Sequence, residues 1–197
     1  MTPPQTKNGR VLDAIAETYG INDSKALGAL SRATLPHRYS KGQRLLDQDE
    51  PQHFVIFVTD GVVRTFHTDD AGNEVTNRFI DRTGKPAVPS IGFDGPAIET
   101  VEALTDVDTL LLEVKAFKSL LATETAVARG YQRMLEEAWR CQWNTTMALR
   151  QKSARKRYLW FLDEYPGLID RISHRHIASF LAMAPETLAR VRKGLAR

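Results

Sequence analysis

The chain has very little cysteine and no long apolar run. Its 197 residues include one cysteine, Cys141, so neither an internal disulfide framework nor a cysteine-based metal cluster can form within one chain. No stretch approaches the roughly 18 consecutive apolar residues that a membrane helix needs. The N-terminal MTPPQTKNGR has no apolar core behind its charges, unlike a secretory signal. These absences predict a cytoplasmic protein with no membrane partner.

Signatures of catalysis and metal binding are also missing. The sequence shows no nucleophile elbow, no glycine-rich phosphate loop before a helix and no paired histidine and acid. His37, His53 and His67 are scattered and lack metal-ligand spacing. We therefore expect no enzyme, no metal site and no resident cofactor.

Charge, in contrast, is concentrated at one end. From Arg150 to Arg197 there are 11 lysines and arginines against 4 acidic residues, whereas the preceding 149 residues hold 16 basic and 20 acidic ones. The C-terminal segment is therefore basic, and its composition is that of a folded domain. These two properties favour a polyanion as its partner. A basic surface that is only solvated is the alternative.

Short segments rich in β-branched and aromatic residues occupy the middle of the chain, separated by turn signals such as Asp60-Gly61. Their spacing predicts an antiparallel roll or barrel. The expected strands are 54–59, 62–67, 75–80, 97–104 and 109–114. Helices are expected at 11–19, with Gly20 as its stop, at 23–33 and at 116–121. Residues 1–8 are expected to be disordered and 81–95 to form an irregular loop.

A long helix is expected over residues 125–151. Apolar residues recur in it at alternating steps of four and three, a heptad pattern typical of a dimerising coiled coil. The seam consists of Val127, Tyr131, Met134, Ala138, Cys141, Thr145 and Ala148. A second stripe consists of Leu135, Trp139, Trp143 and Leu149. We interpret the helix as packing on its own β domain and on a partner helix, the alternative being one broad core face in a monomer.

The last 25 residues predict two short helices with a tight turn. The first begins at Ser173 as N-cap and ends at Leu181, and the second has Pro185 in its first turn, where the missing N–H costs nothing. This pattern matches a helix-turn-helix, whose second helix enters the major groove. Arginine can pair with guanine there, and glutamate can accept from cytosine. The residues expected to contact DNA are Arg175, Glu186, Thr187, Arg190, Lys193 and Arg197.

These residues also carry a family resemblance. The string from Ile177 to Arg190, IASFLAMAPETLAR, resembles the helix-turn-helix of Crp/Fnr-type bacterial regulators. YSKGQRLL at 39–46 and FVTDGVVR at 57–64 resemble the opening strands of that family's cyclic-nucleotide-binding-like roll. The resemblance covers roughly residues 10–197.

The resemblance implies an α+β protein in three parts. Residues 1–122 would form N-terminal helices and an antiparallel jelly-roll sensor, 123–151 a dimerisation helix, and 152–197 a winged-helix-like helix-turn-helix domain lacking most of the wing. It further implies a homodimer that binds a two-fold symmetric operator on double-stranded DNA. RNA polymerase is a further candidate partner.

The sequence departs from the family at several positions. Pro185 stands where the family often has an arginine, so the operator should differ from the best-known consensus. Ala182 replaces the usual turn glycine, so either an alanine adopts a left-handed conformation at a cost of about 1 kcal/mol or the turn is built differently. Ala184 is a poor N-cap.

A cyclic-nucleotide site in this family needs an arginine that pairs with the cyclic phosphate. The corresponding segment, residues 89–100, contains no arginine, so we expect no response to cyclic AMP. Another small effector remains open. The candidate pocket residues are Arg78, Arg82, Ile91, Phe93 and Ala97.

The sequence thus predicts a DNA-binding transcription regulator. The alternative is a degenerate sensor of the same fold that regulates through protein contacts.

Overall fold

The computed structural model describes residues 7–87, 93 and 95–195. The elements are α1 (Lys7–Tyr19), α2 (Ser24–Ala33), β1 (Thr34–Tyr39), β2 (Arg44–Leu46), β3 (Phe54–Asp60), β4 (Val63–Thr68), β5 (Glu74–Ile80), β6 (Lys85–Pro86), β7 (Thr100–Ala103), β8 (Val107–Glu113), α3 (Val114–Thr123), α4 (Thr125–Gln151), α5 (Ala154–Glu164), a 3₁₀ turn (Leu168–Asp170), α6 (His174–Phe180) and α7 (Pro185–Leu195). Of the segment expected to be disordered, residues 1–6 lie outside the described part, and residues 7 and 8 begin α1.

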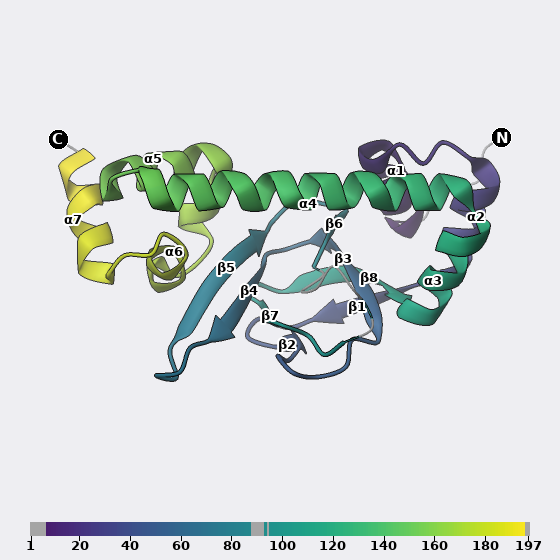
Figure 1. Ribbon diagram of the computed structural model, residues 1–197, viewed down its shortest axis with the longest axis horizontal. Coiled ribbons are helices and arrows are strands. Elements are labelled where there is room, and N and C mark those ends of the chain that lie inside the picture. The colour runs from purple at the N-terminus through teal and green to yellow at the C-terminus, as the bar shows by residue number, and fades with distance from the viewer. Residues whose placement is uncertain (1–6, 88–92, 94, 196–197) are drawn as a thin grey trace. The chain divides into compact units, whose positions relative to one another are not determined.

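The strands form two sheets, in the orders β1-β8-β3-β6 and β2-β7-β4-β5 (Figure 1). β8 pairs antiparallel with both β1 and β3, which confirms the predicted antiparallel roll. The short strand β6 pairs antiparallel with Phe57 and Val58. The expectation of a wholly irregular loop over 81–95 was therefore wrong at this point, because a pairing of two residues leaves no alternation that a sequence pattern could reveal.

Small β-branched side chains fill the interior of the roll. Val58, Val63, Val101 and Val107 come from different strands, and each is at most 1% exposed. Burying each valine contributes about 1.5–3 kcal/mol, so this packing holds the sheets together.

A second apolar core joins the N-terminal helices to the first half of α4. Gly20, in the left-handed region at φ 63°, ends α1 as predicted, and Asp23 caps α2 by accepting from the N–H of Ala26 at 2.8 Å. Gly130 lets α4 pack closely against the segment that follows α1, since a Cβ at Gly130 would lie 2.7 Å from Cγ1 of Ile21. Arg133 also donates to the carbonyl of Tyr19 at 3.1 Å.

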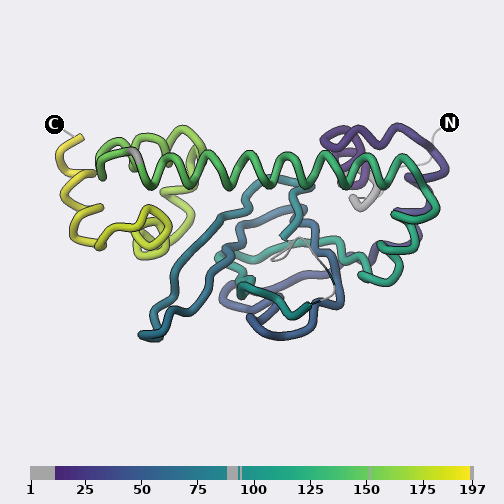
Figure 2. Tube along the Cα trace, viewed as in Figure 1, coloured from purple at the N-terminus to yellow at the C-terminus, as the bar shows by residue number. Residues whose placement is uncertain are grey.

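The chain divides into two compact units, and the division falls within α4. One comprises residues 1–65 and 79–137, and the other comprises residues 66–78 and 138–197. The second therefore includes the tip of the β4–β5 hairpin, which can be followed as a long loop of chain in Figure 2.

Aromatic packing forms the centre of the second unit. Phe180 of α6 stacks on Trp160 at 6.0 Å between ring centroids and meets Tyr165 edge-on at 5.7 Å. Phe161 and Leu168 are fully buried beside them. Within the described residues, no helix has the length and apolarity needed to span a bilayer.

Candidate nucleic-acid interface

Helices α6 and α7 form the predicted pair at the C-terminal end. Ser173 caps α6 by accepting from the N–H of Arg175 at 3.3 Å, which confirms the predicted N-cap. Ile177, Ala178 and Leu188 are at most 1% exposed, so the two helices pack through one apolar contact. The small side chain of Ala178 permits this close approach.

The turn between the helices contains a strained alanine. Ala182 has a φ of 50°, in the left-handed region that an L-residue with a Cβ rarely adopts. The N–H of Met183 then reaches back to the carbonyl of Ala178 at 3.0 Å. Of the two alternatives at this position, the left-handed alanine is the one adopted.

The outer face of α7 carries charge. Glu186, Arg190 and Lys193 are exposed, whereas Leu188 is buried. Steps of four and three place the three charged side chains on one face of the helix. An exposed arginine and glutamate on such a face have the donor and acceptor groups that read base edges.

The other predicted contact residues have different surroundings. Arg175 is exposed at the start of α6, and Thr187 is half-buried near the start of α7. Arg197 lies outside the described residues. All of the described candidates thus belong to α6 and α7.

One contact of this pair of helices was not foreseen from the sequence. Nη1 of Arg192 lies 3.0 Å from Nδ1 and 2.8 Å from Nε2 of His174. The two residues are 18 positions apart, on different helices, so no local pattern relates them. The contact joins the Arg192 side chain of α7 to the first residue of α6.

The predicted dimerisation seam on α4 separates into two parts. Val127, Tyr131 and Met134 pack in the core formed with α1, α2 and α3, and burial raises the pKa of the Tyr131 phenol. These side chains thus pack against their own chain, and their predicted role as partner contacts stays a prediction. Further along, Cys141 is exposed, Ala138 and Thr145 are half-buried and Ala148 is buried.

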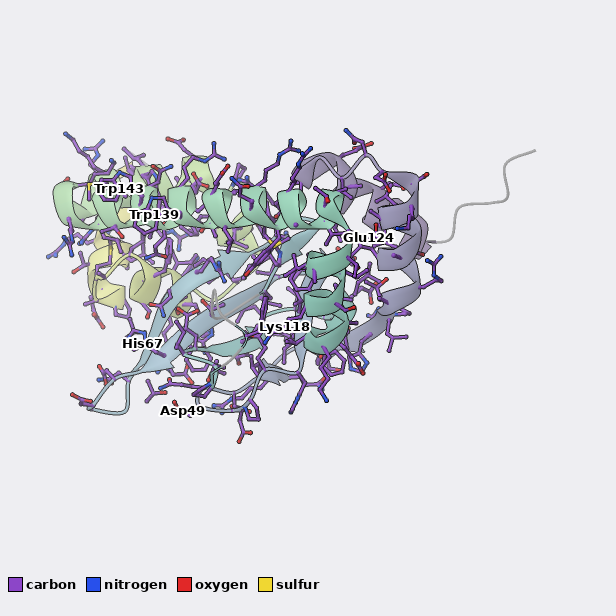
Figure 3. All side chains as sticks on the ribbon, turned by 45° about the vertical axis from the view of Figure 1, so that its right-hand side comes forward. Asp49, His67, Lys118, Glu124, Trp139 and Trp143 are labelled. Carbon is purple, nitrogen blue, oxygen red and sulfur yellow. The ribbon has the colours of Figure 1, made fainter. Side chains whose placement is uncertain are left out.

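The second stripe of α4 contains the exposed apolar side chains. Trp139 is 68% exposed and Trp143 is 54% exposed, and they lie one helical turn apart (Figure 3). Large aromatic side chains are usually buried or covered. This short segment therefore offers an uncovered apolar surface.

The candidate effector residues do not share one environment. Phe93 packs edge-on against Phe117 at 5.6 Å and tilted against Tyr131 at 6.1 Å, so it belongs to the helical core. Ala97 is buried, and its backbone bonds to Asp49 and Glu50. Arg78 is half-buried and Arg82 is exposed. Ile91 lies outside the described residues.

A cyclic nucleotide in this fold would meet residues 89–100. Ala97 is buried, and the neighbouring Ile98 is 63% exposed, so an apolar side chain is exposed to solvent there. Residues 89–100 supply no arginine for a cyclic phosphate. These residues do not fit that ligand.

Comparison with known proteins agrees with this geometry. Residues 36–124 match the model of the cyclic nucleotide-binding domain family. None of the curated protein sequences gives a significant match to the chain.

Solved structures share the fold over most of the chain. FixK2 from Bradyrhizobium japonicum superposes with a TM-score of 0.70 at 22% identity, covering 83% of this chain and 84% of that one. The c-di-GMP responsive regulator CLP from Xanthomonas campestris gives 0.72 at 13% identity, covering 88% and 92%. A Eubacterium rectale protein assigned to the Crp/Fnr regulators gives 0.73 at 18% identity, covering 93% and 88%. The resemblance predicted from the sequence is confirmed at the level of the fold.

Proposed function

We propose that this chain, which has the fold of Crp/Fnr-type regulators, is a transcription regulator that binds specific DNA sequences as a homodimer. The observation that carries the proposal is the exposed face of α7, where Glu186, Arg190 and Lys193 lie opposite the buried Leu188. Arg190 would pair with a guanine and Glu186 with a cytosine, each good contact being worth about 1–3 kcal/mol of discrimination. Arg175 and Lys193 would contact phosphates.

The homodimer is proposed to form through the exposed tryptophan segment of α4. Trp139 and Trp143 present the large apolar area that a helix contact needs, and Cys141 is exposed on the intervening turn. A two-fold pair of recognition helices would then bind half-sites about one turn of DNA apart.

We further propose that DNA binding does not require cyclic AMP. Support comes from the absence of an arginine in residues 89–100 and from the burial of Ala97. A different effector in the roll would act by biasing the arrangement of the recognition helices.

DNA binding can be tested by selection from a random duplex library at near-physiological salt, without added nucleotide. We expect enrichment of a two-fold symmetric site that Arg190→Ala no longer binds. Arg32→Ala, which removes an exposed arginine from α2, is the matched control and should bind as the native chain does. Failure to enrich any site, with and without cyclic AMP, would instead favour regulation through protein contacts.

The dimer can be tested separately by sedimentation. The double variant Trp139→Lys and Trp143→Lys should sediment as a monomer and bind the selected site much more weakly, because one recognition helix contributes only half of the contacts. Leu35→Lys, at a leucine of β1 that is 58% exposed, is the control for added surface charge. A double variant that remains dimeric would exclude this segment as the interface.

A further inference from the structure

A groove runs between α5 and α7 in the C-terminal unit. Its volume is ≈ 620 Å³. It is lined by Tyr158, Leu159, Leu162, Arg192, Lys193 and Leu195. The groove adjoins the exposed face of α7 that carries Glu186 and Arg190, since Lys193 belongs to both. Leu195, which also lines the groove, lies on a different side of α7.

The floor of the groove is apolar. Leu159 is 41% exposed, although α5 buries Tyr158 and Phe161 on its inner side. Leu159 and Leu162 lie one turn apart on α5, and Leu195 of α7 lines the groove with them. An exposed leucine beside two half-buried ones offers a stripe on which an apolar helix face can pack.

The rim on the α7 side is cationic. Arg192 and Lys193 are adjacent there, and the guanidinium of Arg192 lies against the His174 ring as described above. No carboxylate occurs among the described residues that line the groove. Leucines beside positive charge complement a segment that presents leucines beside negative charge.

This combination selects among occupants. A DNA backbone would satisfy the cations but has no apolar surface for the three leucines. A second copy of the same groove would bring its own Arg192 and Lys193 against these, which is repulsive. An amphipathic helix with an acidic border satisfies both features, in the manner of helix-in-groove recognition.

We propose that the α5–α7 groove binds an acidic amphipathic helix of a partner protein. Its apolar stripe would lie on Leu159, Leu162 and Leu195, and its carboxylates would face Arg192 and Lys193. Lys193 is shared with the proposed DNA contact, but the inference is tested by peptide binding in the absence of DNA.

The test uses a fluorescein-labelled synthetic peptide of about four helical turns, with leucines spaced three and four apart and glutamates between them. Titration of the full chain, followed by fluorescence anisotropy, should give saturable binding that weakens with added salt. Two control peptides, one with the same composition in scrambled order and one with lysine for every glutamate, should bind far less. No binding of the acidic peptide, or equal binding of either control, would overturn the proposal.

Two variants locate the binding. Leu159→Gln and Lys193→Glu should each weaken peptide binding by about tenfold or more, equivalent to 1.4 kcal/mol. Leu35→Gln and Lys118→Glu make the same exchanges at exposed positions of β1 and α3 and should leave binding unchanged (Figure 3 labels Lys118). Thermal unfolding of each variant checks that the fold is intact. If groove and control variants bind alike, the peptide lies elsewhere and the proposal fails.

Two further measurements separate the other occupants. Loss of duplex DNA binding in Leu159→Gln, without loss of peptide binding, would assign the groove to nucleic acid. A change of oligomeric state in Leu159→Gln would assign it to a second copy. Either result overturns the proposal, whereas a peptide-only effect supports it whether or not the chain binds DNA.

Discussion

The hydroxyl of Ser179 on α6 accepts a hydrogen bond from the backbone N–H of Thr76 on β5, at 2.9 Å. The same oxygen donates to the backbone carbonyl of Glu74 at 3.1 Å. β5 is the outermost strand in the order β2-β7-β4-β5, so among the described residues no further strand pairs with its outer edge. One serine of the helix-turn-helix thus satisfies an N–H and a C=O that a neighbouring strand would otherwise take.

Replacing Ser179 with alanine should destabilise the C-terminal unit. Thr76 is 3% exposed, so its N–H would lose its partner away from water, at a cost of about 1–3 kcal/mol. Urea unfolding should show a lower free energy of unfolding, and hydrogen exchange at the Thr76 amide should accelerate. Ser119→Ala, at an exposed position of α3, is the matched control. Equal effects of the two variants would contradict a specific role for the Ser179 hydrogen bonds.

Ala182→Gly should stabilise the protein. Its φ of 50° costs an alanine about 1–2 kcal/mol, which glycine does not incur. Part of that gain is offset by the greater freedom of glycine in the unfolded chain, so we expect a net gain of about 0.5–1 kcal/mol in the free energy of unfolding. Ala189→Gly, in the middle of α7, should have the opposite sign. If both changes destabilise, the strain at Ala182 is not significant.

Gly61→Ala should be strongly destabilising. Gly61 has a φ of 95°, and a Cβ there would lie 2.4 Å from the backbone carbonyl oxygen of Asp106. Strain and this contact with rigid backbone should together cost about 2 kcal/mol or more. Gly72→Ala is the control, because Gly72 also has a positive φ but a Cβ there would meet no atom of the described residues within 4 Å. The difference between their midpoints in urea isolates the steric part, and equal midpoints would contradict it.

Acid should weaken the β4–β5 hairpin through Asp69. The N–H of Asn73, with help from its side chain and from the N–H of Ala71, holds the pKa of the Asp69 carboxyl below its ordinary value of about 3.9. Because the folded pKa is the lower one, the stabilisation is present above the unfolded value and is lost as pH falls through the folded value.

Asp69→Asn should therefore have a lower free energy of unfolding than the native chain near neutral pH. This difference between the two chains should become smaller in acid, and urea unfolding at several pH values measures it. Asp163→Asn, at an exposed position of α5, is the control. A difference that stays constant with pH would show that the ionised carboxylate does not matter at this position.

Local patterns predicted the elements well where they depend on neighbours in sequence. Ser173 begins a helix and Gly20 ends one, as expected, because N-caps and left-handed stops are decided by a few adjacent residues. The predicted face of Glu186 and Arg190 also follows from helical spacing alone. Helix ends and helix faces are both set by the geometry of a single element.

Relations between distant segments were not accessible from the sequence. The heptad pattern is present on α4, but the sequence does not say that Val127 and Met134 share a core with residues of α1 and α3 of the same chain. The same holds for Phe93, which joins an aromatic cluster with Phe117. The contacts of Ser179 with Thr76 and of Arg192 with His174 span 103 and 18 positions, and no periodicity encodes them.

The two halves of α4 are consequently open to different kinds of change. Its first turns are committed to the core of their own chain, so a substitution at Met134 or Gly130 is judged by whether the protein still folds. Trp139 and Trp143 are exposed, so substitutions there do not disturb the core of the chain. Under the proposed dimer, descendants of one gene could therefore stop pairing with each other through a few exchanges in one helical turn, each keeping an unaltered fold.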